Sequence, residues 1–395
     1  MDFDKKMKHK SIFFLLYSMN IGGVEKSLLN LLSSMPHDVY DIHIGLIHPE
    51  GGFMDSLSPD VKVHVIEGVS EHWRELKDPP LKTIKRFFIA GRLLKAFAAL
   101  CIYIVCKIYG GFYWWVNYVL KDVKELDGSY DVAVAYAGPA SDIDYYVVNK
   151  IQAKKKIGWI HFDIDKVGHD KKMINRLYGF YDRIVVVSDS CRKKFLDRFP
   201  CYEGKTVTIN NIVSPKLIRE QATIGDTFQS ESHSKKILTV GRISVEKGQL
   251  VALDALKILV QKGYDVVWYF VGDGSDRDTC ENKVFAEGLM NHVVFLGSLS
   301  NPYGYMRDCD VYVQPSRYEG YCVTILEALC FNSPIVSTNF TSIEEQLEGR
   351  ENAFIVGMSA EDISLGIEKA LLASKTNNVR EKENKDIQKF LSIID

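Results

Sequence analysis

A chain of 395 residues is too long for one ordinary hydrophobic core, so its length predicts two domains. Its 46% hydrophobic and 25% charged residues are typical of a folded globular protein, and the formal net charge of −2 excludes a nucleic-acid partner held by bulk positive charge. Eight cysteines without any CxxC pair, and a polar start without the apolar segment of a signal peptide, indicate a cytoplasmic protein.

The first predicted unit is a strand, a glycine turn and a helix. Residues 11–17 form an apolar run typical of a buried parallel strand, Gly22 and Gly23 follow, and residues 24–32 have helical spacing. Such a turn allows close backbone approach to a ligand, although it lacks the GxGxxG dinucleotide fingerprint. The alternative is a glycine turn that only starts a helix.

After strands predicted at 40–47 and 61–66, the pattern changes to an apolar and basic helical insertion at residues 81–124. The uncharged runs 96–106 and 108–120 are each shorter than a membrane span, and Gly110-Gly111 is expected to break the helix between them. Basic residues beside large apolar ones favour helices that lie on a membrane surface through residues 81–123, with ordinary buried helices and, least favoured, a true membrane span as the alternatives.

Four further strands are predicted in the first half, at 130–136, 155–161, 183–187 and 207–212. His161 ends the second of these, where open α/β sheets place ligands, although a lone histidine is often structural. The polar residues 214–234 are interpreted as an interdomain link with a flexible surface segment.

The second half alternates strands with helices, which predicts an α/β fold with a parallel doubly wound sheet. Its strands are expected at residues 237–240, 265–271, 292–296, 310–314 and 334–338. Arg242 follows the first of these strands and Lys247 precedes a helix predicted at 249–261. Two cations at the carboxyl end of a strand would clamp a diphosphate, unless they are surface bases in a loop.

A helix is also predicted from Val323 to Phe331, with Glu319 before it and Glu327 inside it. The helix N-terminus would bind the diphosphate of a nucleotide-diphosphate sugar, and one carboxylate would hold the hydroxyls at each end of that molecule. The alternative is a solvated helix face. Asp-x-Asp pairs occur too often to indicate a metal site, so neither a metal nor another cofactor is expected.

Gly241-Arg242 with Lys247-Gly248, and Glu319-Gly320 with Glu327-Ala328, resemble the retaining glycosyltransferases of family four, of the bacterial cell-surface polysaccharide type. The family's frequent Phe-Pro or Phe-Gly is Tyr321-Cys322 here. The resemblance implies the GT-B fold, two Rossmann-like doubly wound domains with an interdomain cleft. It implies an acceptor-binding domain at 1–210, a nucleotide-sugar-binding domain at 211–375 and a C-terminal helix at 376–395 that crosses back.

The implied reaction moves a sugar from a UDP- or GDP-linked donor to a glycan acceptor, expected to be lipid-linked, at the inner face of the plasma membrane. Catalytic roles are implied for Arg242, Lys247, Glu319 and His161. Donor contacts are implied for Gly22, Gly23, Gly241, Leu299, Gly320, Tyr321, Cys322, Val323, Thr324 and Glu327. The alternatives are a sugar phosphorylase, a nucleotide-sugar epimerase or an inactive membrane-bound scaffold.

Overall fold

The computed structural model describes residues 9–166, 170–228, 234–375 and 385–395. The described chain divides into two compact units. The first holds the residues up to Asn20, Leu32–Ile209 and Ile387–Asp395; the second holds Ile21–Leu31 and Asn210–Asp386. The roles assigned above to an acceptor domain and a donor domain stay predictions.

The first unit is built on a parallel sheet with the strand order β3-β2-β1-β4-β5-β6-β7. Strand β1 lies inside the sheet between β2 and β4, and Ile12–Leu16 are buried because helices cover both faces of such a sheet. The strands are β1 (Lys10–Leu16), β2 (Tyr40–Leu46), β3 (Lys62–Val65), β4 (Ser129–Gly138), β5 (Gln152–Ile160), β6 (Arg183–Val186) and β7 (Thr206–Thr208).

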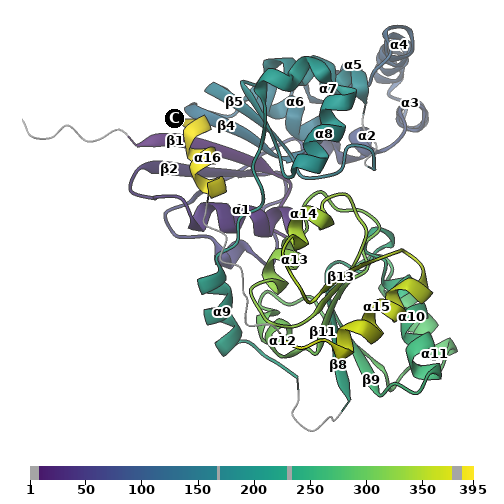
Figure 1. Cartoon of the computed structure of the whole chain (residues 1–395). Coiled ribbons are helices and arrows are strands. Elements are labelled where there is room, and N and C mark those ends of the chain that lie inside the picture. Colours follow the sequence, from purple (N-terminus) through teal and green to yellow (C-terminus); the bar gives the residue numbers. More distant parts are fainter. Residues whose placement is uncertain (1–8, 167–169, 229–233, 376–384) are drawn as a thin grey trace, which may run out of the picture. The chain divides into compact units, whose positions relative to one another are not determined.

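Helices surround this sheet (Figure 1). They are α2 (Trp73–Lys77), α3 (Pro80–Ile89), α4 (Leu93–Tyr109), α5 (Tyr113–Leu120), α6 (Ser141–Lys150), α7 (Lys171–Leu177), α8 (Asp189–Arg198) and α16 (Lys385–Ile394). Phe390 of α16 packs against the rings of Phe14 and Trp159, so the end of the chain contributes to the core of the first unit.

The second unit contains a parallel sheet with the strand order β10-β9-β8-β11-β12-β13. Its strands are β8 (Lys235–Val240), β9 (Val266–Val271), β10 (Val293–Gly297), β11 (Val311–Gln314), β12 (Ile335–Thr338) and β13 (Ala353–Val356). Its helices are α1 (Gly23–Ser33, of which residues to Leu31 belong here), α9 (Pro215–Ile224), α10 (Gln249–Gln261), α11 (Arg277–Ala286), α12 (Tyr303–Asp308), α13 (Val323–Ala328), α14 (Ile343–Leu347) and α15 (Ala360–Leu372).

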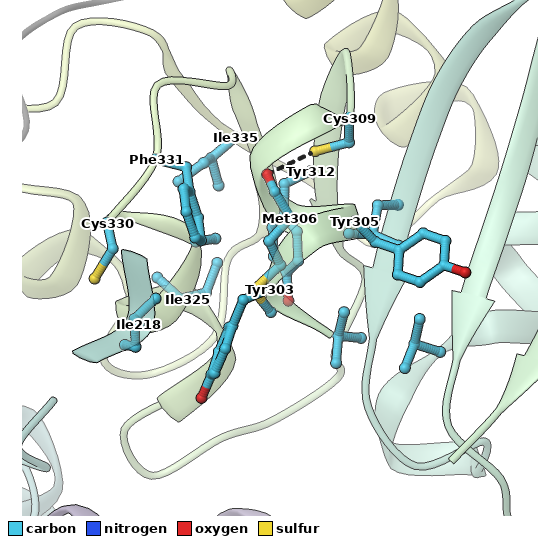
Figure 2. Close-up of a cluster of buried hydrophobic side chains, with 14 of the residues drawn as sticks. Ile218, Tyr303, Tyr305, Met306, Cys309, Tyr312, Ile325, Cys330, Phe331 and Ile335 are labelled. Carbon is cyan, nitrogen blue, oxygen red and sulfur yellow. Dashed lines mark hydrogen bonds between the residues drawn. The ribbon is translucent and has the colours of Figure 1, made fainter. Parts of the chain in front are cut away.

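The two doubly wound parallel sheets confirm the predicted α/β fold class. The interpretation of 214–234 as a link was wrong in part, because α9 spans Pro215–Ile224. Ser214 caps this helix through its side chain, and Ile218 and Ala222 are buried in a hydrophobic cluster shown in Figure 2.

The helix predicted from Val323 to Phe331 is also shorter than expected. Helix α13 ends at Ala328, and the chain then tightens into turns in which Cys330 N–H donates to the carbonyl of Glu327 and Phe331 N–H to that of Ala328. Bonds between residues three apart close a helix end in this way.

Residues 80–120 form helices α3, α4 and α5. Gly110 and Gly111 separate α4 from α5 with φ of 62° and 105°, so the predicted break is confirmed. These angles favour glycine over any residue with a Cβ. Within the described ranges, none of the helices combines the length and the apolar character needed to cross a membrane.

Candidate functional site

The candidate site of the second unit is formed by two loops that follow neighbouring strands. Strands β8 and β11 pair in parallel at the point where the strand order reverses, so Val240 and Gln314 end at the same edge of the sheet. Open α/β sheets bind ligands at this point. The loops that follow, residues 241–248 and 315–322, contain three of the predicted catalytic residues, Arg242, Lys247 and Glu319.

Gly248 allows these two loops to pack closely. It has φ of 76°, and a Cβ at this position would overlap the carbonyl oxygen of Pro315. The N–H of Arg317 also donates to the carbonyl oxygen of Glu246 at 2.8 Å. The backbone of the first loop is thereby fixed against that of the second.

An ion pair joins the two loops. The ammonium of Lys247 lies 2.5 Å from Oε1 of Glu319, and the hydroxyl of Ser316 donates to the same oxygen at 2.7 Å. Burial acts to lower the pKa of Lys247, but the Glu319 carboxylate outweighs it and raises that pKa above its usual value. Lys247 is therefore a fixed cation, and Glu319 is held in one orientation.

Buried polar side chains hold Ser316, the hydrogen-bond donor to Glu319, in its position. The side-chain amide of Gln314 donates to Ser316 Oγ at 2.8 Å, and its Oε1 accepts from Tyr312 at 2.9 Å and from Thr324 at 3.0 Å. The hydroxyl of Thr338, at the end of β12, donates to the carbonyl of Ser316. Satisfied buried networks of this kind specify one arrangement of the groups they hold.

The start of α13 is held from outside the loop. The side chain of Gln346 accepts from the N–H of Cys322 at 3.0 Å and donates to its carbonyl at 2.9 Å. Asn211 donates to the carbonyl of Tyr321 at 2.8 Å. Burial, and secondly Glu319, raise the pKa of Cys322 to about 12, so this thiol is neutral. These bonds fix the backbone of Tyr321 and Cys322 at the start of α13.

Glu327 is a buried carboxylate inside α13. The hydroxyl of Tyr303 donates to its Oε1 at 2.7 Å, and the ammonium of Lys26 lies 5.1 Å from the centre of the Tyr303 ring. Burial raises the pKa of Glu327, while Lys26 and the Tyr303 hydrogen bond act in the opposite direction. A cation and a donor thus stabilise the charged form of a carboxylate that burial disfavours.

Arg242 is exposed beside the start of α1. A Cβ on Gly22 would lie 3.9 Å from a terminal nitrogen of Arg242 and would overlap the Glu25 carboxylate, whereas a Cβ on Gly23 would meet no atom within 4 Å. Burial raises the pKa of Glu25, and Arg242 partly offsets that increase. The predicted residues Gly22 and Arg242 are therefore neighbours within the second unit.

The remaining predicted residues have different environments. Gly241 begins the first loop, Gly320 lies in the second, and Leu299 follows β10 and packs on the hydrophobic cluster of Figure 2. His161, in the first unit, is buried with its ring stacked on Trp159, and its Nε2 has no hydrogen-bond partner. Burial lowers the pKa of His161 to about 3, so this histidine is neutral.

Sequence reasoning missed the supporting residues Tyr303, Gln314, Ser316, Thr338 and Gln346. None of them belongs to a recognisable motif, although Gln314 and Ser316 lie between the predicted strand at 310–314 and the predicted site residue Glu319. In the described ranges no group of three or more His, Cys, Asp or Glu side chains is arranged to hold a metal ion.

Known proteins resemble this chain in sequence and in fold. Residues 222–387 match the family described as glycosyl transferases group 1. An uncharacterized glycosyltransferase of Methanocaldococcus jannaschii is 24% identical over 237 residues, which cover 56% of this chain and 58% of that protein. The capsular polysaccharide biosynthesis glycosyltransferase CapM of Staphylococcus aureus is 26% identical over 181 residues, 44% of this chain and 47% of CapM. The match thus spans less than two thirds of either relative.

The crystal structure of Anabaena HepE in complex with UDP-glucose has a TM-score of 0.66 and 18% sequence identity to this chain. The alignment covers 98% of this chain and 100% of HepE. At this identity the likeness concerns the fold, and it confirms the predicted fold class over nearly the whole chain.

Proposed function

Residues 222–387 match the glycosyl transferases of group 1, and from this match we propose that the chain is a member of that family. We propose that it transfers a sugar, with retention of anomeric configuration, from a nucleotide-diphosphate sugar to a glycan acceptor. The observation that carries this proposal is the ion pair of Lys247 and Glu319 at the carboxyl ends of β8 and β11. A cation for the diphosphate and a carboxylate for the sugar are fixed side by side.

In the proposed reaction the bond between the anomeric carbon and the diphosphate oxygen breaks, and negative charge grows on that oxygen. Lys247 and Arg242 stabilise this charge, which is electrostatic catalysis by preorganised groups. An ammonium has three N–H donors, so Lys247 can bind phosphate while it keeps its contact with Glu319.

The acceptor hydroxyl forms the new bond on the face that the diphosphate leaves, and the departing phosphate oxygen takes its proton. Glu319 accepts hydrogen bonds from the donor sugar, and Glu327 accepts them from the ribose. His161, which is neutral, would contribute to the acceptor side by a hydrogen bond from or to a sugar hydroxyl. The positive charges of Arg242 and Lys247 support a mechanism without a divalent metal.

The proposed donor is UDP- or GDP-linked. HepE was crystallised with UDP-glucose, which supports a UDP-sugar. CapM is named for capsular polysaccharide biosynthesis, which supports a polysaccharide acceptor. That this acceptor is lipid-linked and is reached at the inner face of the plasma membrane is part of the proposal. Residues 81–123 would bring the chain to that surface.

The experiment that tests this function incubates the protein with a panel of UDP- and GDP-sugars, with and without lipid-linked glycans extracted from a capsulated bacterium. We expect release of nucleotide diphosphate only when both substrates are present, and a product with the anomeric configuration of the donor by NMR. Turnover of the donor without an acceptor would favour an epimerase, and phosphate-dependent release of sugar phosphate would favour a phosphorylase.

A second arm of this experiment repeats the transfer in excess EDTA. We expect the rate to stay unchanged. Loss of activity that magnesium restores would contradict the metal-independent mechanism while leaving the transfer itself established. Failure of every donor in the panel to bind would favour an inactive scaffold.

A further inference from the structure

The outward face of α4 carries large apolar side chains. Leu94 and Phe97 are 87% and 69% exposed, and Leu93, Leu100, Ile104 and Ile108 continue this exposed face at helical spacing. The buried residues of α4 are Ala96 and Ala99. A helix that packs on a protein core points its large apolar residues inward. Helix α4 does the reverse, with small residues inside and large ones outside.

Helix α3 extends this apolar surface. Every residue from Phe88 to Lys95, across the turn between α3 and α4, is exposed, and Ile89 is 73% exposed. The buried residue of α3 is Thr83. Helices α3 and α4 lie side by side at the margin of the first unit (Figure 1), and we call residues 80–109 the apolar hairpin.

Helix α5, which follows the hairpin, has the opposite character. Trp115, Val116, Val119 and Leu120 are all buried, and the indole N–H of Trp115 donates to the carbonyl of Glu75 at 2.8 Å. Helix α5 therefore packs within the protein. The surface available to a partner is narrower than residues 81–123 and consists of α3 and α4.

The charge of this region has one sign. Residues 79–121 contain seven Lys and Arg and no Asp or Glu, in a chain whose totals are 49 basic and 51 acidic residues. Lys82 and Arg86 form ion pairs with Asp78, which precedes the hairpin. The other basic side chains of the hairpin, which are exposed and have no ion-pair partner among the described residues, are Lys85, Arg92, Lys95 and Lys107.

We propose that the apolar hairpin inserts its outer face into the interface of an anionic lipid bilayer. Exposed Leu, Ile and Phe would enter the boundary between headgroups and acyl chains, and the unpaired bases would contact anionic headgroups. The 17 residues of α4 rise about 26 Å, which is less than the roughly 30 Å of a bilayer's hydrocarbon core, so we expect the helix to lie along the surface. A second copy of the chain fits less well, because two hairpins of like charge repel each other. The inference rests on the proposed function only for its purpose, which is to reach a lipid-linked acceptor.

Flotation of the full chain with lipid vesicles tests this inference without any need for activity. Vesicles of phosphatidylcholine alone are compared with vesicles that also contain phosphatidylglycerol, at low and at high salt. We expect the chain to float with the anionic vesicles, and we expect salt to weaken that binding, because salt screens the attraction between the bases and the headgroups.

Two double variants separate the apolar contribution from the charged one. Leu94→Glu with Phe97→Glu should abolish flotation with both vesicle types. Arg92→Gln with Lys95→Gln should weaken binding to anionic vesicles roughly 25-fold, at about five-fold per basic residue, and leave binding to phosphatidylcholine unchanged. Phe285→Glu is the matched control, because Phe285 is 73% exposed on α11 of the other unit and should float like the wild type.

Three results would overturn the inference. The wild type could stay unbound with both vesicle types, the Leu94→Glu and Phe97→Glu variant could float as well as the wild type, or the wild type could sediment as a dimer that this variant dissociates. The last result would assign the hairpin to a second copy of the chain. A protein that floats as expected but transfers no sugar would refute the proposed function alone.

Discussion

The hydroxyl of Tyr303, at the start of α12, donates a hydrogen bond of 2.7 Å to the carboxylate of Glu327, and both side chains are buried. Figure 2 shows the Tyr303 ring at the edge of the hydrophobic cluster, with its hydroxyl directed away from the labelled neighbours. One oxygen of Glu327 is thus occupied by the protein itself. The proposed ribose contact would use the second oxygen, in an orientation that Tyr303 fixes.

Replacing Tyr303 by Phe should weaken nucleotide binding through its effect on Glu327. The change removes a hydrogen bond that stabilises the charged carboxylate, so the pKa of Glu327, already raised by burial, should rise further. Calorimetric titrations with UDP or GDP over a range of pH would measure this shift. Both proteins should lose affinity for the nucleotide on acidification, and the variant should lose it at a higher pH than the wild type. The free energy of unfolding should fall by about 1–3 kcal/mol.

Tyr305→Phe is the control for this experiment, because Tyr305 is a largely buried tyrosine of the same helix. It should leave the pH dependence of binding unchanged. If Tyr303→Phe only lowers stability and the pH profile does not move, Tyr303 has a structural role alone.

Replacing Lys247 by Ala should lower kcat/KM by two to three orders of magnitude, as removal of a preorganised group that stabilises transition-state charge does (about 10²–10³-fold). Binding of the donor should weaken less than the rate. Steady-state kinetics with the best donor of the panel would measure both. Lys262→Ala, which breaks an exposed ion pair of 2.6 Å with Glu368, is the matched control and should keep full activity. Turnover near the wild-type rate in the Lys247 variant would contradict the catalytic role proposed for Lys247.

Most strands of the two sheets could be predicted because they contain a short group of apolar residues bounded by glycine, proline or polar residues. Strand β13 (Ala353–Val356) escaped prediction because its four residues are too few to establish a pattern. Helix α9 was not predicted because serine and threonine surround it. A start signal for this helix is nevertheless present in Ser214-Pro215, followed by Ile218 and Ala222 at a spacing of four.

The partners of the site residues were harder to predict than the residues themselves. Lys247 and Glu319 were singled out separately, for the diphosphate and for the sugar, and the structure pairs them across 72 positions of the chain. Gln346 and Tyr303 carry no motif, and each lies 24 positions from the residue that it holds. Only the packing of β11 against its neighbours brings such segments together, and local periodicity contains no information about that packing.

Replacing Gly248 by Ala should destabilise the second unit and separate its two loops. The left-handed backbone conformation alone costs a residue with a Cβ about 1–2 kcal/mol, and overlap with the Pro315 carbonyl adds to that cost. Gly263→Ala is a matched control, because Gly263 has φ of 83° but open space around it. Urea denaturation should show a loss for Gly248→Ala well beyond that for Gly263→Ala. Equal losses of the free energy of unfolding in the two variants would mean that the loop of residues 315–322 moves away from the new Cβ at no energetic cost.

The stability of the first unit should fall with acid through His161. Burial lowers its pKa from the ordinary 6.5 to about 3, so the unfolded state binds a proton at a higher pH than the folded state does. The contribution of neutral His161 to the free energy of unfolding is therefore complete above pH 6.5 and is lost progressively as the pH falls toward 3. At pH 5 the free energy of unfolding should be lower by about 2 kcal/mol.

Urea denaturation of the wild type and of His161→Phe at pH 7.5 and pH 5 would measure this loss. The phenylalanine ring can keep the stack on Trp159 but cannot take a proton, so the variant should be less sensitive to acid by roughly the same 2 kcal/mol. His72→Gln, at a half-exposed position, controls for the removal of one imidazole. An unchanged acid sensitivity in His161→Phe would mean that water reaches the imidazole, and His161 would then be free to meet a ligand in its charged form.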